Sequence, residues 1–232
     1  MQRVHKAIFN LLKDEPGKSL LDLACGRGEL GTALGDKGFR VVFADRYDFP
    51  PDRGRCVRVD LNEPLPFKNG RFDIIICAES LQYLENHEAF FSEANRLLSP
   101  EGILVVSFPN ILTLSERFYF LRRGWFSCFR PVRGKNRRSE WANVVYHVFS
   151  FVEIYQYLKK NGFEIIQAFS PDISRKGSWL YPLIKGFYSL GLIFDRDTEK
   201  ARLVTWLMSR DFLKGDHLIV SGRKKTDSNL GQ

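Results

Sequence analysis

Three carboxylates and a glycine turn are the residues of this 232-residue chain whose types and spacing indicate chemistry. The apolar run Leu20–Leu23 contains Asp22 and leads into Gly26, Gly28 and Gly31. Glycines between a strand and a helix let the backbone approach a ligand closely. This G-x-G-x-x-G spacing is also typical of nicotinamide dinucleotide sites, and taken alone it is a weak indicator.

The carboxylates distinguish between the candidate ligands. Asp22, at the end of its strand, would repel a pyrophosphate and attract a cationic amino group, which S-adenosylmethionine has and a dinucleotide lacks. Asp45 and Asp60 end the next two strand-like runs, where one can take both hydroxyls of a ribose and the other an adenine amino group. Each acid alone could instead cap or stabilise a turn by hydrogen bonding to the backbone. Together, beside the glycines, they favour a S-adenosylmethionine site.

An alternation of strand-like and helix-like stretches must position these residues, and it predicts an α/β fold. Asn86 predicts the start of a helix that ends before Pro100, and Ser150 with Glu153 predicts a capping box at the start of another. Seven short runs rich in Val, Ile, Leu or Phe predict strands covered on both faces. They are Ser19–Leu23, Arg40–Ala44, Cys56–Val59, Phe72–Cys77, Ile103–Phe108, Phe163–Gln167 and His217–Ser221.

These motifs together resemble those of class I S-adenosylmethionine-dependent methyltransferases. The resemblance rests on Leu21–Gly28, Val42–Asp45, Asp60–Phe67, Phe72–Leu81 and Leu98–Leu104, and it covers nearly the whole chain. It implies a Rossmann-like seven-stranded, mostly parallel sheet with an antiparallel last strand and helices on both faces. It also implies S-adenosylmethionine as the cofactor.

The resemblance further implies which residues bind the cofactor. From its methionine part through the ribose to the adenine, they are Asp22, Gly26, Gly28 and the main chain of Cys77, then Asp45, then Asp60 and the backbone of Leu61. Arg46 departs from the family pattern, because the residue after the ribose acid is often apolar and lies against adenine. Tyr47 is the alternative for that contact.

His147 and Tyr83 are the candidate catalytic residues. Methyl transfer is an in-line displacement, so positioning supplies most of the rate, and an alcohol acceptor also benefits from a base such as histidine. His147–Phe151 resembles a His-x-x-x-Phe-Thr signature of a bacterial subgroup, whose pattern also includes Phe108–Asn110. Tyr83 stands where relatives often carry histidine. A structural role is the alternative for both, and the other histidines are assigned no role.

The net charge of +8 comes from one segment, because basic and acidic residues are equal in number outside it. Arg117–Arg138 holds eight basic residues and no acid, interleaved with aromatic rings. Such a segment suits an anionic partner with planar or apolar parts. We therefore expect an anionic acceptor of the small-molecule or glycan type, with O-methylation favoured. A solvated basic face is the structural alternative.

Two other functions remain open at this point. An RNA methyltransferase would also use basic and aromatic residues, and a catalytically silent S-adenosylmethionine-binding module would keep the same glycine turn.

The apolar segment Trp179–Phe194 is too short to span a bilayer and predicts a lid, a peripheral membrane contact or a subunit interface.

Length and composition predict one domain over residues 1–232, with acceptor-site insertions at about 109–149 and 170–216. A hydrophobic content of 44% excludes intrinsic disorder.

The four cysteines are widely separated in the sequence, so we expect free thiols and no metal site. Met1–Asp14 lacks the features of a signal peptide, and we expect a cytoplasmic protein.

Overall fold

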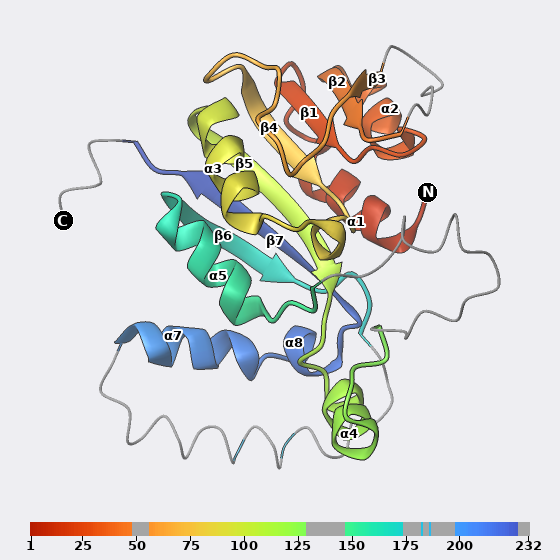
Figure 1. The fold of residues 1–232 in the computed structure, drawn as a ribbon, viewed down its shortest axis with the longest axis vertical. Coiled ribbons are helices and arrows are strands. Elements are labelled where there is room, and N and C mark those ends of the chain that lie inside the picture. The colour runs from red at the N-terminus through yellow and green to blue at the C-terminus, as the bar shows by residue number, and fades with distance from the viewer. Residues whose placement is uncertain (48–55, 129–146, 174–181, 183–185, 187–197, 227–232) are drawn as a thin grey trace.

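The fold is organised around a seven-stranded sheet (Figure 1). The computed structural model describes residues 1–47, 56–128, 147–173, 182, 186 and 198–226. The strands, in chain order, are β1 (Ser19–Leu23), β2 (Arg40–Asp45), β3 (Cys56–Arg58), β4 (Phe72–Cys77), β5 (Leu98–Pro109), β6 (Phe163–Phe169) and β7 (His217–Lys224). They lie side by side in the order β3-β2-β1-β4-β5-β7-β6.

The direction of β7 sets it apart from the other strands. Neighbours among β1 to β5 pair in parallel, whereas β7 is antiparallel to both β5 and β6. Its first residue, His217, therefore pairs with Pro109, the last residue of β5. The predicted mostly parallel sheet with an antiparallel last strand is confirmed.

The strand limits follow the sequence prediction closely, with one substantial difference. β1 and β4 have the predicted limits. β5 begins at Leu98 instead of Ile103, because Leu98 already pairs with Phe72 before a shift in register. β6 and β7 extend beyond their predicted ends because they pair with each other up to Lys224.

Helices cover both faces of the sheet, as predicted. They are α1 (Arg3–Leu12), α2 (Glu29–Gly35), α3 (His87–Leu97), α4 (Leu114–Arg123), α5 (Phe151–Lys160), α7 (Thr198–Leu207), α8 (Arg210–Lys214) and the short 3-10 helix η1 (Leu81–Tyr83). Asn86 caps α3 by accepting the Ala89 N–H at 3.0 Å, and Ser150 with Glu153 forms the predicted capping box of α5. None of the described helices is long and apolar enough to cross a membrane.

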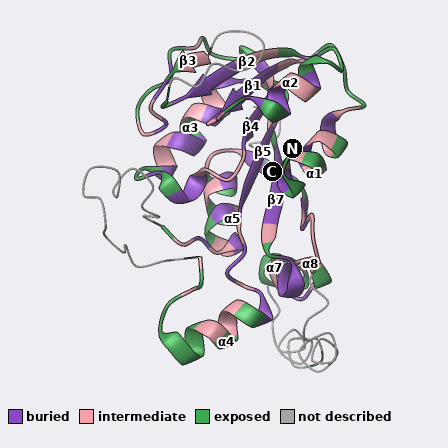
Figure 2. Ribbon diagram, turned by 90° about the vertical axis from the view of Figure 1, so that its right-hand side faces the viewer, coloured by how far each residue is buried: buried purple, intermediate pink, exposed green. Residues whose placement is uncertain are grey.

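Two apolar clusters lie on opposite faces of the sheet. Alternate residues of a strand point to opposite faces, so Ile74 and Ile76 of β4 join one cluster and Ile75 joins the other. The first of these clusters includes Ile8 of α1 and Leu34 of α2. The second cluster is covered by α3, α5, α7 and α8. In Figure 2 the strands β1, β4, β5 and β7 are largely buried.

The two expected insertions are described only in part. The first contains α4, which extends away from the sheet and is mostly exposed (Figure 2). The second contains α7 and α8. The basic residues from Arg130 to Arg138 lie outside the described residues, as does Trp179–Phe194 apart from Pro182 and Gly186.

Asn110, the residue after β5, fixes the start of β7. Its amide donates to the carbonyl oxygens of Phe212 and Gly215, both at 2.8 Å, and its backbone N–H donates to that of Asp216 at 2.9 Å. Its side-chain oxygen accepts the Leu112 N–H at 2.9 Å. Since Asn110 is buried, these bonds hold the turn between α8 and β7 against the end of β5.

Replacing Asn110 by alanine is expected to lower the free energy of unfolding by about 1 to 3 kcal/mol, because two buried carbonyls lose their donor. Urea denaturation measures this. Asn10→Ala, at an exposed position of α1, is the matched control and should change it by less than about 0.5 kcal/mol. An equal effect of both variants would contradict the role given to Asn110.

Candidate active site

The glycine turn joins β1 to α2 at the carboxyl edge of the sheet. Ala24, Gly26 and Gly28 have φ values of 53°, 53° and 70°, in the left-handed region that glycine adopts without strain. Gly28 is the residue before α2, so the first free N–H groups of that helix begin at the turn. The turn therefore presents backbone donors at the edge where parallel strands end.

Asp22 is a buried carboxylate behind this turn. It is 3% exposed, and its Oδ2 accepts the Gly31 N–H at 3.1 Å. Burial raises the pKa of Asp22 to about 7; the hydrogen bond from Gly31 opposes this shift and the charge of Asp45 adds to it. A carboxylate in this state gains stability from a nearby cation.

Asp45 ends β2, and Asp60 lies two residues after β3, which ends at Arg58 instead of the predicted Val59. The two oxygens of Asp45 accept the Gly26 N–H at 2.8 Å and the Tyr47 N–H at 2.9 Å, and each oxygen keeps a second lone pair. Oδ1 of Asp60 accepts the backbone and side-chain N–H groups of Asn62, both at 3.0 Å. The structure thus brings together the three acids that the sequence singled out.

A groove of about 300 Å³ is lined by one of these acids, Asp60, together with Arg46, Arg58 and Val59. The Arg46 guanidinium is 3.5 Å from Oδ2 of Asp60. The Arg46 side chain is 65% exposed, so this ion pair adds little to stability. It holds the planar guanidinium of Arg46, a residue of the groove lining, beside Asp60.

Leu61 and Cys77 are buried, so their side chains belong to the core. Cys77 ends β4 beside Leu23 and Val106, and burial raises the pKa of its thiol. What Cys77 can offer at the sheet edge is its main chain, in line with the role implied by the family resemblance. That role, like the Leu61 backbone contact, stays a prediction.

Cys25 and Cys56 are closer than their sequence separation suggests, with Sγ atoms 3.8 Å apart. None of the four cysteines is in a disulfide bond. Burial raises the pKa of Cys25, which keeps it as a thiol. Within the described part of the chain, no group of three or more His, Cys, Asp or Glu side chains is arranged to hold a metal ion.

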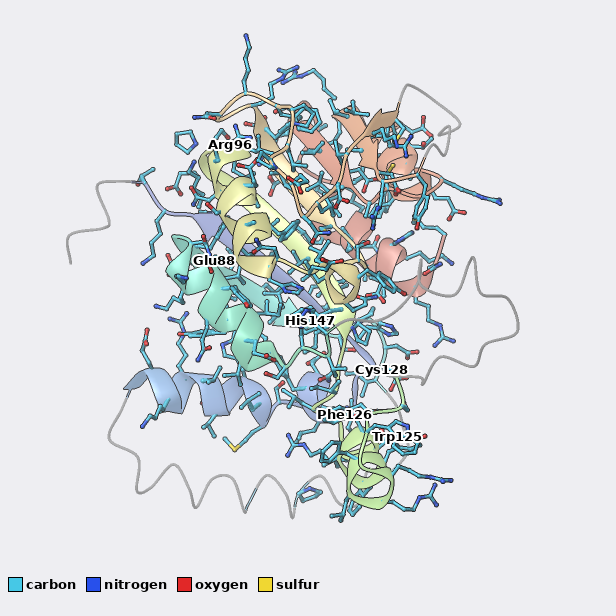
Figure 3. The ribbon with its side chains drawn as sticks, viewed as in Figure 1. Glu88, Arg96, Trp125, Phe126, Cys128 and His147 are labelled. Atoms are coloured by element: carbon cyan, nitrogen blue, oxygen red, sulfur yellow. The ribbon has the colours of Figure 1, made fainter. Side chains whose placement is uncertain are left out.

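A second cavity, of about 100 Å³, holds both predicted catalytic residues. Its lining is Gln82, Tyr83, Phe108, Pro109, Cys128, His147, Val148 and Phe149. Figure 3 shows His147 and Cys128 near the end of β5. The His147 N–H donates to the Gln82 carbonyl at 3.4 Å, and its ring lies edge-on to that of His87 with centroids 4.9 Å apart. Tyr83 is 41% exposed.

His87 supports the wall of this cavity from inside the core. Its Nε2 is 2.9 Å from the Leu81 carbonyl oxygen, and burial lowers its pKa. A neutral His87 can donate this hydrogen bond without a buried charge. It therefore acts as a core residue that fixes η1, the helix that carries Tyr83.

The chain that carries these residues is similar to known protein families. A model described as a methyltransferase domain matches residues 1–168 of the chain. The chain belongs to this methyltransferase family. Its sheet and its relatives identify it as a class I S-adenosylmethionine-dependent methyltransferase, with S-adenosylmethionine as the methyl donor.

Two curated relatives of this methyltransferase each match less than half of the chain. A protein of Mycolicibacterium smegmatis, named for S-adenosylmethionine-dependent methyl transfer, is 30% identical over 121 residues, or 49% of this chain and 47% of its own. The ubiquinone/menaquinone biosynthesis C-methyltransferase UbiE of Shewanella baltica is 36% identical over 107 residues, or 39% and 42%. The chain spans about half the length of these curated relatives.

The fold similarity extends over the whole chain. The crystal structure of a S-adenosylmethionine-dependent methyltransferase from Mesorhizobium loti has a TM-score of 0.61 at 19% identity and covers 96% of this chain and 98% of its own. At this identity the likeness shows the fold alone. It agrees with the Rossmann-like sheet predicted from the sequence.

One polar cluster of the methyltransferase was indicated by no sequence motif. Glu79 follows β4, and its carboxylate contacts Ser107 of β5 at 2.9 Å and His217 of β7 at 3.1 Å. These residues are far apart in the chain, and His217 had been assigned no role. The available signals were a histidine and an acid at strand ends, which do not reveal which strands are neighbours.

Gly31 is required where α2 passes Asp22. A Cβ there would lie 2.5 Å from Phe43 Cε1 and 2.7 Å from Asp22 Oδ2. Gly31→Ala is therefore expected to lower the free energy of unfolding by about 1 to 3 kcal/mol, measured by urea denaturation. Gly35→Ala, whose Cβ would meet only Val41 at 3.9 Å, is the control and should be neutral or slightly stabilising. Equal midpoints for the two variants would contradict this packing.

Proposed function

We propose that this chain methylates a hydroxyl group of an anionic small-molecule or glycan-type acceptor. The observation that carries the proposal is the cavity containing His147 and Tyr83, at the same edge of the sheet as the glycine turn and its three acids. A donor site and an adjoining cavity with polar side chains are what methyl transfer requires, because positioning of the two reactants supplies most of the rate.

The acids and the turn fit S-adenosylmethionine in charge and in hydrogen-bonding capacity. We assign Asp22, Gly26, Gly28 and the Cys77 main chain to its methionine part. The raised pKa of Asp22 supports this, because the amino group of the cofactor would compensate a buried carboxylate. Asp45 is assigned to the ribose, since its oxygens keep lone pairs for two hydroxyls.

The groove beside Asp60 is assigned to the adenine. Asp60 and the Leu61 backbone would meet its polar edge. Arg46 takes the place of the apolar residue common in the family, because a guanidinium is planar and stacks on aromatic faces. Its contact with Asp60 supports this placement.

His147 and Tyr83 are proposed to contact the acceptor from the wall of the second cavity. The hydroxyl of Tyr83 would orient the acceptor by a hydrogen bond. His147 is the base predicted from the sequence, and replacement by glutamine tests this prediction, since glutamine keeps a polar side chain without the titrating imidazole. The similar protein UbiE is named a C-methyltransferase, so similarity to methyltransferases does not fix the methylated atom.

The acceptor is proposed to be anionic because α4 places cations and apolar side chains together in solvent. Phe118 is 59% and Leu121 is 81% exposed, with Arg122 and Arg123 next to them. Glu116 is on the same helix, but its carboxylate accepts hydrogen bonds from Ser127. An RNA acceptor is the second candidate on the same observation.

We further propose that the protein acts in the cytoplasm as one domain, with 109–149 and 170–216 as acceptor-site insertions.

Incubation with methyl-tritiated S-adenosylmethionine and a cell extract tests methyl transfer. Label in a glycan or small-molecule fraction is expected with the wild type and about 100-fold less with Asp22→Asn, because the cofactor loses its ionic partner. Calorimetry supplies a second readout. Since cation binding favours ionised Asp22, wild-type affinity should fall about tenfold from pH 7.5 to pH 6. Asp22→Asn should bind weakly and without this dependence.

These outcomes separate the competing functions. Cofactor binding without any labelled fraction would indicate a silent binding module. Label in the RNA fraction would replace the glycan-type acceptor by RNA. The same pH dependence in both proteins would show that Asp22 does not face the amino group.

The role of the basic helix is tested by salt dependence. Replacing Arg122 and Arg123 by glutamine is expected to raise the KM for the labelled acceptor about threefold to tenfold at low salt and to flatten its dependence on ionic strength. kcat should change little. The control replaces Lys68 and Arg71, two exposed basic residues before β4, in the same way. Identical salt profiles for the two double variants would exclude an anionic acceptor held by α4.

A further inference from the structure

Three strands bring Glu79, Ser107 and His217 together at the carboxyl edge of the sheet. The Ser107 hydroxyl donates to Oε1 of Glu79 at 2.9 Å, and its oxygen accepts the Glu79 backbone N–H at 3.0 Å. Oε2 of Glu79 is 3.1 Å from Nε2 of His217. Ser107 is fully buried, whereas the His217 side chain is 40% exposed. The cluster is thus anchored in the core and open on the histidine side.

The backbone at Glu79 is strained. Its φ is 54°, in the left-handed region that non-glycine residues rarely adopt. Such strain persists where surrounding contacts hold it, and it is concentrated at functional sites. Here the reciprocal bonds with Ser107 hold both the backbone and the carboxylate of Glu79 in place.

The cluster adjoins the proposed acceptor cavity on two sides. Pro109, which lines that cavity, pairs directly with His217. Gln82, another lining residue, donates to the Glu79 carbonyl oxygen at 2.8 Å. Glu79 is also two residues after Cys77, the last residue of β4, at the edge of the sheet where the parallel strands end.

The contact with Glu79 determines what the imidazole can do. A carboxylate that accepts the Nε2–H of a histidine fixes the ring and leaves Nδ1 as a proton acceptor. In the described part of the chain, Nδ1 of His217 has no hydrogen-bond partner. The imidazole of His147 instead contacts the rings of His87 and Phe149, with no described carboxylate bound to it.

We propose that His217 is the general base of the reaction, with Glu79 as the residue that positions it. The inference rests on the proposed O-methylation. The acceptor hydroxyl gives its proton to Nδ1 of His217 as its oxygen bonds to the methyl carbon and the carbon–sulfur bond breaks. The sulfur keeps that electron pair, so S-adenosylhomocysteine and a methyl ether result, and the proton passes from the imidazolium to water.

The surrounding charges are compatible with this role. The hydrogen bond with Glu79 raises the pKa of His217 against the opposing effect of burial, and Asp216 adds to the rise. His5 of α1 also feels the charge of Glu79, but burial lowers its pKa, so it stays neutral and does not neutralise the carboxylate. Glu29 of α2 is paired with the N-terminal amine at 3.3 Å.

The first experiment measures the imidazole directly. In NMR titrations of the protein with S-adenosylhomocysteine, His217 is expected to titrate above its ordinary pKa of about 6.5. Glu79→Gln should move this titration to lower pH, because the stabilising charge is lost. An unchanged titration would show that Glu79 does not control His217, and the proposal would fail.

The second experiment follows methyl transfer into the fraction that the wild type labels, from pH 5.5 to pH 9. His217→Gln and His217→Asn are expected to lower kcat at least about 100-fold and to bind S-adenosylhomocysteine within about threefold of the wild type. Since neutral His217 is the active form, wild-type kcat should fall below its pKa. In Glu79→Gln this fall should begin at lower pH. Arg223→Gln, on an exposed part of the same strand, is the control.

The outcomes separate this inference from the function on which it rests. If the wild type transfers no methyl group, the proposed function fails and the inference with it. If the wild type is active and His217→Gln keeps its kcat and pH profile, only the inference fails. Loss of the low-pH fall in His147→Gln, with no such change in His217→Gln, would return the base role to His147.

Discussion

The reversed direction of β7 is the constraint on which the arrangement of the acceptor side depends. Because β7 is antiparallel to β5, its first residue comes to the edge where the parallel strands end. A parallel strand in the same place would put its last residue there. The four hydrogen bonds of Asn110 hold the start of β7 in position. Glu79, which accepts a hydrogen bond from Ser107, contacts His217, the first residue of β7.

The site combines two local departures from ordinary stability. Asp22 is buried, which raises its pKa, and Glu79 has a strained backbone. Both are held by strong local contacts, the first by the Gly31 N–H and the second by Ser107. Departures of this kind are expected where a ligand, rather than the fold, supplies the compensating interaction.

Much of the fold and of the arrangement of the glycine turn and its acids could be predicted from the sequence, because their signals are local. The glycine turn, the capping box at Ser150 and the apolar runs each lie within a few residues of the chain. The start of β5 at Leu98 was missed, since it depends on pairing with Phe72. The proximity of Cys25 to Cys56 was missed for the same reason: it depends on which strands are neighbours.

The acceptor half is harder to predict because it is assembled from contacts between distant segments. The family match ends at Ala168, before α7, α8 and β7, so the general pattern of the family carries no information about His217. Sequence reasoning favoured His147, which a motif marks, over His217, which only three-dimensional pairing brings beside Glu79. Many enzymes bind the same methyl donor, so the residues that bind it follow a shared sequence motif. Acceptors differ between enzymes, so the residue that takes the proton from the acceptor has to be identified from the structure of the individual protein.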